Sequence, residues 1–195
     1  MTGIPTLTTK RLTIRRAAES DFDAIHELSA RGWGDGSNIK SEEAREESRQ
    51  GLEWNLLNDL FPRLRWWNDR LITLTDTQKV IGSIALVPMP LPLDAVINGS
   101  DSDMGQVAEI SMIWVLLPEY RGSGYATEAA GALVDFAFKQ FKLKRIIADT
   151  ERENKASQGV MRRLGMTLYE NKSVKLDWLE IIGVLNNPEM GTGQS

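Results

Sequence analysis

The segment Arg121–Thr127, which reads Arg-Gly-Ser-Gly-Tyr-Ala-Thr, has the residue types of an anion-binding loop. Ser123 lies between two glycines, where an apolar run from Val107 to Leu117 is followed by a segment of helical periodicity. Because glycine has no Cβ, such a turn brings several backbone N–H groups together. The start of the following helix adds further amides and a partial positive charge. The pattern predicts a pyrophosphate ligand, and a tight turn without a ligand is the alternative.

Two nucleotide-binding folds use glycine-rich loops of this kind. A Rossmann fingerprint requires Gly-x-Gly-x-x-Gly/Ala, usually in an N-terminal unit, whereas Gly122-Ser-Gly124-Tyr-Ala-Thr127 ends in threonine and lies midway along the chain. Asp149, at the end of the next predicted strand, keeps the Rossmann alternative open. A P-loop is excluded, because no Gly-Lys-Ser/Thr follows the glycines.

The rest of the composition narrows the chemistry. The chain has no cysteine and a single histidine, His26, so it lacks thiolate nucleophiles, disulfides and a second imidazole for a metal centre. No Gly-x-Ser-x-Gly elbow occurs, and His26 falls on a predicted surface helix, which argues against Ser/His hydrolysis. We therefore expect no metal cofactor.

Length and charge predict a single soluble domain. With 195 residues and 42% hydrophobic content, the chain can bury a core, and we expect one domain over residues 1–195, with a core at about 9–185 and a flexible tail at 186–195. The 23 basic and 27 acidic residues give a net charge of −4, without the basic excess of a nucleic-acid-binding protein. No apolar run approaches the roughly 20 residues that span a bilayer, and the first ten residues have no signal-like core. A cytoplasmic location is predicted, with no membrane partner.

Before the glycine-rich loop, hydrophobic periodicity predicts strands and helices. They are a strand at Arg11–Arg16, a helix opened by Ser20–Asp23, a helical region at Ser41–Leu60, and an antiparallel hairpin of Arg70–Thr75 and Lys79–Val87. Pro88–Gly105, with three prolines and a cluster of polar turn residues, is predicted to be a long loop.

From the loop onwards, strands alternate with helices. The predicted elements are a strand at Val107–Leu117, a helix at Gly124–Phe141, a strand at Arg145–Thr150, a helix at Asn154–Leu164 and two closing strands. Asn154 is a predicted N-cap, and Gly165 lies at the C′ position of the same helix. This alternation is typical of a mixed α/β sheet.

The region Val107-Ala-Glu-Ile to Leu117-Pro-Glu-Tyr-Arg-Gly-Ser-Gly-Tyr-Ala-Thr-Glu-Ala-Ala130 resembles motif A of the Gcn5-related N-acetyltransferase (GNAT) family. The family motif Arg/Gln-x-x-Gly-x-Gly/Ala is matched by Arg121, Gly124 and Ala126. The resemblance covers nearly the whole chain. Its flanking motifs are Thr9-Lys-Arg-Leu-Thr-Ile-Arg, Glu153-Asn-Lys-Ala-Ser157 and Arg163-Leu-Gly-Met-Thr167, and they are similar to the branch that includes the ribosomal-protein N-terminal acetyltransferases.

The resemblance implies an α/β (α+β) fold and acetyl-CoA as co-substrate. The implied sheet is mixed and mostly antiparallel, has six to seven strands and about four flanking helices, and is splayed between its fourth and fifth strands, where the pantetheine arm enters. The residues that the resemblance assigns to acetyl-CoA are Trp114, Val115, Leu116, Arg121, Gly122, Ser123, Gly124, Tyr125, Ala126, Thr127, Asn154 and Ser157. Of these, Asn154 and Ser157 match an Asn-x-x-Ser element that lies near the pantetheine and thiol; a helix cap is the alternative role for Asn154.

Without a cysteine or a Ser/His pair, we expect a primary amine to attack the thioester directly in a ternary complex. Glu109 and Ser111 lie two apart on one predicted strand, hence on one face, and are the candidates for the amine side of the reaction. Ser157 is the candidate donor to the leaving thiolate. In many relatives the position of Ser111 holds glutamate, and that of Met161 holds the tyrosine that protonates the thiolate.

The amine acceptor stays open between a protein N-terminus and a small molecule, and the assembly between a monomer and a homodimer. Four tryptophans and several acids lie where this fold usually shapes the acceptor pocket, namely Trp33, Trp54, Trp66, Trp67, Glu42, Glu43, Glu46 and Glu47. Core tryptophans and a solvated acidic helix face are the other interpretation of the same residues. A non-catalytic acyl-CoA-binding module and, less well supported, a Rossmann-type NAD-dependent oxidoreductase are the alternative functions.

Overall fold

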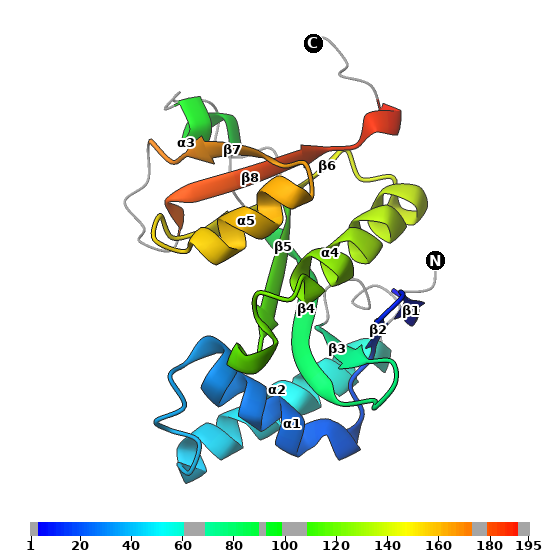
Figure 1. Cartoon of the computed structure of the whole chain (residues 1–195), viewed down its shortest axis with the longest axis vertical. Coiled ribbons are helices and arrows are strands. Elements are labelled where there is room, and N and C mark those ends of the chain that lie inside the picture. The colour runs from blue at the N-terminus through cyan, green and yellow to red at the C-terminus, as the bar shows by residue number, and fades with distance from the viewer. Residues whose placement is uncertain (1–3, 61–68, 90–92, 99–108, 173–178, 191–195) are drawn as a thin grey trace. The chain divides into compact units, whose positions relative to one another are not determined.

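The computed structural model describes residues 4–60, 69–89, 93–98, 109–172 and 179–190. The chain forms two compact units, one made of Met1–Leu86 with Trp114–Ala132 and the other of Val87–Ile113 with Leu133–Ser195. Figure 1 shows the helices and strands of both.

Antiparallel strands form the sheet of the first unit. They are β1 (Leu7–Thr8), β2 (Leu12–Arg15), β3 (Arg70–Leu74) and β4 (Val80–Met89), of which the residues up to Leu86 belong to this unit. In the register of β2 and β3, Leu12 lies opposite Leu74. The predicted hairpin is confirmed: β3 pairs with β4, and Gln78 in the turn takes a positive φ of 59°.

Two helical segments cover this sheet. The first comprises α1 (Phe22–Glu27) and a π-helical turn at Leu28–Trp33, and the second is α2 (Glu42–Leu60). Ala17, Leu52, Leu71 and Val80 form a buried cluster against which Phe22 packs, so α1 and α2 share a core with β3 and β4.

His26, the single histidine, has a structural position in this first unit. It was expected on a surface helix but is buried, with its ring nitrogens 3.0 Å from Ser48 Oγ and 2.8 Å from the Ile39 carbonyl oxygen. These two hydrogen bonds link α1 to the second turn of α2 and to the segment before that helix.

The second unit contains the other end of the sheet. Its strands are the first part of β5 (Glu109–Leu116), then β6 (Arg145–Thr150), β7 (Thr167–Glu170) and β8 (Ile181–Asn186). β5 and β6 are parallel, with Ser111 opposite Ile147, whereas β6–β8 and β7–β8 are antiparallel. The strand order along the whole sheet is β1-β2-β3-β4-β5-β6-β8-β7. The predicted mixed, mostly antiparallel sheet is thus confirmed.

Helices pack on both faces of the β6–β8 pair. Leu93 and Val96 of α3 (Leu93–Asn98) share a buried cluster with Ile147 and Ile182. The other face is covered by α5 (Lys155–Arg163). Gly183 of β8 faces this helix, since an added Cβ would lie only 3.1 Å from Met161 Sδ. Figure 1 shows α5 running along β8. The helix α4 (Tyr125–Phe136) continues as a π-helical turn at Ala137–Phe141. Together they confirm the helix predicted at Gly124–Phe141.

Three predictions need correction. The stretch Pro88–Gly105, predicted as a loop, contains α3, because Leu93 and Val96 have a buried apolar cluster to join; residues 99–105 lie outside the described ranges. The tail predicted at 186–195 is wrong for its first residues, since Asn186 ends β8 and the Asn187 side chain is buried and donates to the Leu143 carbonyl oxygen at 2.9 Å; residues 191–195 lie outside the described ranges. The described residues hold eight strands and five α-helices, rather than six to seven and about four.

Gly82 of β4 lies where β4 and β5 approach each other closely within the first unit. An added Cβ would lie 2.3 Å from the Val115 carbonyl oxygen and 2.5 Å from Leu116 Cδ2, and a backbone oxygen has little freedom to move. We predict that Gly82→Ala lowers the free energy of unfolding by roughly 1–3 kcal/mol in chemical denaturation.

Gly51 provides the matched control, because a Cβ at this position in α2 meets nothing within 4 Å. Gly51→Ala is expected to raise stability by roughly 0.5–1 kcal/mol through its higher helix propensity. Equal stability of Gly82→Ala and wild type would contradict the close approach of the two strands.

Candidate functional site

The predicted phosphate loop connects β5 to α4 in the first unit. A short 3-10 turn at Pro118–Tyr120 ends β5, and then Gly122 and Gly124 adopt φ values of 77° and 81°. This left-handed conformation strains any residue with a Cβ, which explains both glycines. A Cβ at Gly122 would meet nothing within 4 Å, so the loop leaves open space on that side.

The loop also presents the amides that begin α4. The bond from the Glu128 N–H to the Gly124 carbonyl oxygen, 3.0 Å long, marks Gly124 as the residue that starts the helix. In an α-helix the amides before this bond, such as those of Tyr125 and Ala126, have no acceptor one turn back. Together with the helix dipole they make a site suited to an anion.

Arg121, the motif arginine, fixes the start of the loop. Its Nε donates to the Leu116 carbonyl oxygen at 3.0 Å, and its Nη2 donates to the Gly32 carbonyl oxygen at 2.8 Å. Both acceptors are backbone atoms of the same unit, at the end of β5 and in the π-helical turn after α1. Arg121 therefore holds the loop in place through its side chain.

Trp114, Val115 and Leu116 end β5, where the resemblance places main-chain contacts to the pantetheine arm. The Val115 side chain is buried with Leu28 and Leu117, and Leu116 is buried too, so these side chains belong to the core. For Val115 and Leu116, a role toward a ligand is thereby limited to their backbone groups, whereas the Trp114 side chain is only half-buried.

Asn154 caps α5 in the second unit, as predicted. Its Oδ1 accepts the Ser157 N–H at 3.0 Å, and Ser157 itself is half-buried in the first turn of the helix. The Asn-x-x-Ser spacing is thus the spacing of an N-cap and the residue whose amide it holds. The side chains assigned to the pantetheine and thiol therefore lie at a capped helix start.

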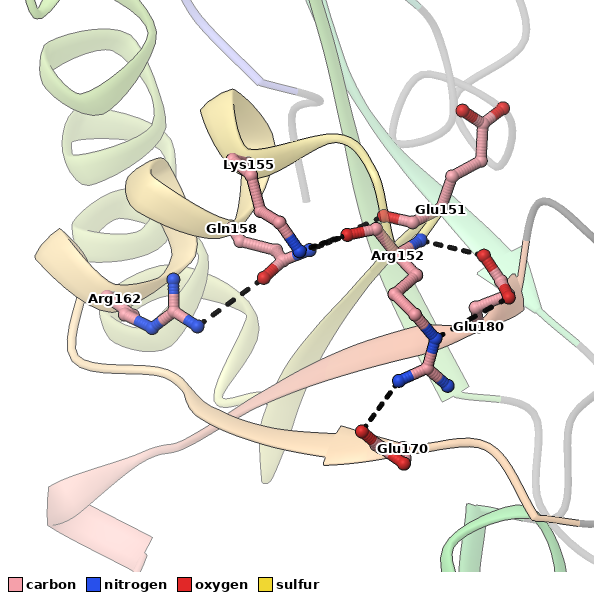
Figure 2. A network of polar contacts seen from close by, with 7 residues as sticks. All are labelled: Glu151, Arg152, Lys155, Gln158, Arg162, Glu170 and Glu180. Atoms are coloured by element: carbon pink, nitrogen blue, oxygen red, sulfur yellow. Dashed lines mark hydrogen bonds and ion pairs between the residues drawn. The ribbon is translucent and has the colours of Figure 1, made fainter.

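A polar network holds the turn before α5 to the neighbouring strands (Figure 2). Arg152 donates from its backbone N–H to Glu180 at 2.8 Å and from Nη1 to Glu170 at 2.7 Å. Its carbonyl oxygen accepts from Lys155 Nζ at 2.6 Å and from the buried Gln158 amide at 2.8 Å. This network fixes the position from which α5 begins, and with it Asn154 and Ser157.

Glu109, the sequence candidate for the proton acceptor, is buried in an ion pair. Both of its oxygens bind Arg145: Nε donates to Oε2 at 2.8 Å, and Nη2 donates to Oε1. A bidentate pair of this kind fixes the orientation of the carboxylate. Proton transfer to Glu109 would compete with these two bonds.

Ser111, two residues further along β5, is fully buried and donates its hydroxyl to Asp149 Oδ1 at 3.1 Å. Asp149 lies on β6 two residues after Ile147, which faces Ser111 in the register, so Ser111 and Asp149 share one face of the sheet. Burial raises the pKa of the half-exposed Asp149 carboxyl, and the bond from Ser111 partly offsets that rise.

The sequence singles out Asp149 only because its place at the end of a predicted strand keeps the Rossmann alternative open. Its pairing with Ser111 joins residues 38 apart in the chain and comes from the parallel pairing of β5 and β6. No local pattern signals such a contact. A raised carboxyl pKa beside a polar partner is typical of functional sites.

Of the proposed acceptor-pocket tryptophans, Trp33 and Trp54 are described, with exposed fractions of 62% and 64%. Core burial is therefore excluded for these two side chains. Trp66 and Trp67 lie outside the described residues.

Within the described ranges, no three His, Asp or Glu side chains gather closely enough to hold a metal ion. Among the helices of those same ranges, none is both long enough and apolar enough to cross a membrane.

The family model for the acetyltransferase (GNAT) domain matches residues 11–167. The chain belongs to this family. The match contains the glycine-rich loop, β5, β6 and α5, which are the elements described above.

Comparisons with individual proteins agree with this assignment. The uncharacterized N-acetyltransferase YnaD of Bacillus subtilis is 47% identical over 53 residues, which are 27% of this chain and only 31% of YnaD. An acetyltransferase structure from Agrobacterium tumefaciens strain C58 is 25% identical, with a TM-score of 0.67, and the match covers 95% of this chain and 96% of that one. The predicted GNAT fold is confirmed.

The structure of Mycobacterium smegmatis RimJ in complex with CoA-disulfide is also similar. The identity is 17% and the TM-score 0.63, and the match covers 94% of this chain and 85% of RimJ, so the similarity shows the fold alone. RimJ-type proteins, the branch suggested by the sequence, are therefore among the fold neighbours.

The raised pKa of Asp149 predicts a pH dependence of stability. The folded state favours the protonated carboxyl, so the stability that this group contributes is present at low pH and is lost as the pH rises through its folded pKa. Asp149→Asn, which keeps an acceptor for Ser111, is expected to be more stable than wild type at pH 7 and equally stable near pH 3.5. Denaturant unfolding across this pH range measures the difference.

Asp135→Asn is the control, because Asp135 lies on the exposed side of α4. A gain at pH 7 that persists unchanged at low pH would show that ionisation of Asp149 is not its cause.

Proposed function

We propose that the protein is an acetyl-CoA-dependent N-acetyltransferase that acetylates a primary amine directly, with both substrates bound at once. The observation that carries the proposal is the loop Arg121–Thr127, which places two positive-φ glycines at the start of α4 in a member of the GNAT domain family. The backbone groups there suit a pyrophosphate by charge and by shape, because no Cβ obstructs them.

The chain's own residues have separate roles toward acetyl-CoA in this proposal. The amides from Gly122 to Thr127 bind the pyrophosphate, and the backbone at Trp114–Leu116 pairs with the pantetheine arm. Asn154 and Ser157 are assigned to the thiol end, where the Ser157 hydroxyl donates to the leaving sulfur. The bound co-substrate supplies an activated thioester, so the enzyme needs no nucleophile of its own.

On the amine side, a carboxylate must accept the proton that the ammonium loses. Glu109 is the candidate from the sequence, but Arg145 occupies both of its oxygens. The geometry favours Asp149, which is half-exposed, is held by Ser111 and has a pKa raised by burial. We propose that Ser111 orients Asp149 and that Asp149 accepts the proton.

A non-catalytic acyl-CoA-binding module is the second candidate function. Met161, at the position where many relatives have a tyrosine acid, is fully buried, and it packs near Gly183. A thioether carries no proton that it could donate to a leaving thiolate. Binding of acetyl-CoA without turnover of any amine in a broad panel would favour this second function.

The first test is thermal unfolding in the presence of cofactors. A ligand at 100 times its dissociation constant stabilises the folded state by about 2.7 kcal/mol, so acetyl-CoA is expected to raise Tm, whereas NAD is not. Gly124→Val should abolish the shift, because a branched side chain at φ 81° strains the loop and would crowd Arg11, whose Nη2 lies 3.5 Å from the position of an added Cβ. The absence of any rise in Tm with acetyl-CoA, at concentrations that stabilise other members of the family, would contradict the proposal.

The second test identifies the proton acceptor by pH–rate profiles of kcat/KM with one confirmed amine. Asp149→Asn is expected to lower kcat/KM by roughly 10²–10⁴ near neutral pH and to leave acetyl-CoA affinity unchanged. Glu109→Gln should act mainly on stability, because it leaves Arg145 without its carboxylate. A loss of this size in Glu109→Gln and a wild-type rate in Asp149→Asn would assign the role to Glu109.

A further inference from the structure

Arg11, just before β2, joins the N-terminal strands to the phosphate loop, and all of its contacts described here lie in the first unit. Its Nη1 donates to the Ser123 carbonyl oxygen at 3.0 Å, and its Nε donates to Glu128 Oε2 at 2.6 Å. The guanidinium lies over the Tyr125 ring, 4.3 Å from the centroid. One side chain thus contacts the loop, the first residue of α4 and the first turn of α4.

The contact with Ser123 determines where one loop amide points. In a planar trans peptide the C=O and N–H groups point in opposite directions. Because Arg11 holds the Ser123 carbonyl oxygen on its own side, the Gly124 N–H of the same peptide unit is directed away from Arg11. Gly124 takes a positive φ of 81° in the loop, and because glycine has more accessible backbone conformations than other residues, the contact with Arg11 restrains this peptide.

Glu128 anchors Arg11 from the other side. Its Oε1 accepts from Thr9 Oγ1 at 2.6 Å and from the Arg11 N–H at 2.9 Å, and its Oε2 accepts from Arg11 Nε. Burial opposes ionisation of this carboxyl, but the bonds from Thr9 and Arg11 outweigh it and hold the pKa below its ordinary value. Glu128 is thus an ionised carboxylate in the first turn of α4.

An ionised carboxylate at this position repels an anionic ligand unless a cation balances it. Arg11 supplies that cation, and its planar guanidinium contacts both Glu128 and Ser123, whereas a lysine ammonium is a point charge on a flexible stem. The pair therefore fixes the loop without adding net negative charge beside it.

We propose that Arg11 is a positioning residue for the acetyl-CoA pyrophosphate: held by Glu128, it orients the Ser123–Gly124 peptide so that the loop amides face the ligand. This inference rests on the proposed function. It assigns Arg11 no contact with the reacting atoms, so its loss should weaken acetyl-CoA binding and leave the chemical step intact.

The experiment measures acetyl-CoA affinity by calorimetry and steady-state kinetics on the full chain. Arg11→Ala is expected to raise the dissociation constant and KM for acetyl-CoA by roughly 10-fold to 100-fold, the usual range for loss of a charged hydrogen bond. The kcat at saturating acetyl-CoA and the KM for the amine should stay within about twofold of wild type.

Arg45→Ala is the matched control. Arg45 bonds Asp23 at 2.8 Å and lies 4.7 Å from the centroid of the Phe22 ring, and its side chain is 42% exposed, against 41% for Arg11. It has the same kinds of contact on the surface of α2 but none described with the loop. Its removal should leave acetyl-CoA affinity unchanged, although it breaks an ion pair and a cation–π contact of an arginine that is equally exposed.

Two further variants separate positioning from simple charge. Removal of a negative charge would by itself favour an anionic ligand, yet Glu128→Gln is expected to weaken acetyl-CoA binding, because it loosens the anchor of Arg11. Arg11→Lys keeps the positive charge but not the planar guanidinium with its several donors. It should recover less than half of the binding free energy that Arg11→Ala loses. Tighter binding by Glu128→Gln, or full recovery by Arg11→Lys, would overturn the proposal.

Wild-type binding separates this inference from the proposed function. If wild type binds acetyl-CoA and Arg11→Ala binds it equally well, Arg11 has no positioning role, although the function stands. If wild type does not bind acetyl-CoA, the function itself fails. Should Arg11→Ala not fold, as judged by circular dichroism, Arg11→Lys and Glu128→Gln decide the question.

Discussion

The start of α4 imposes the constraint on which the rest of the site depends. The first turn of a helix has amides without helical partners, and an anion can bind them only if the preceding loop does not cover them. Here two glycines with positive φ keep the approach open, and Arg121 fixes where the loop leaves β5. Arg11 and Glu128 add further bonds to this loop and to the first turn of α4.

Charge is the second constraint, because the chain has a net charge of −4 and its proposed ligand is anionic. In each unit, a carboxylate on a site element is paired with an arginine from a neighbouring element: Glu128 with Arg11, and Glu109 with Arg145. Asp149 instead meets a neutral hydroxyl, and burial raises its pKa. This difference in partners separates structural carboxylates from one suited to proton transfer.

Local sequence patterns predicted much of the fold and the loop but few of the contacts. The β3–β4 hairpin, β6 and the Asn154 cap follow from periodicity and from turn and cap residues within a few positions. α3 was missed because prolines precede its short apolar stripe. The Arg11–Glu128 pair spans 117 residues, so only the folded chain brings these two side chains together. Residue patterns predict elements and caps, whereas partners across the fold depend on topology.

The most direct test of the central claim is an amide NMR titration of the full chain with acetyl-CoA and with acetylpantetheine, which has the thioester but no pyrophosphate. If the loop binds the pyrophosphate, the N–H resonances from Gly122 to Thr127 shift with acetyl-CoA and stay in place with acetylpantetheine. If acetyl-CoA binds and these resonances do not move, the loop is not the pyrophosphate site.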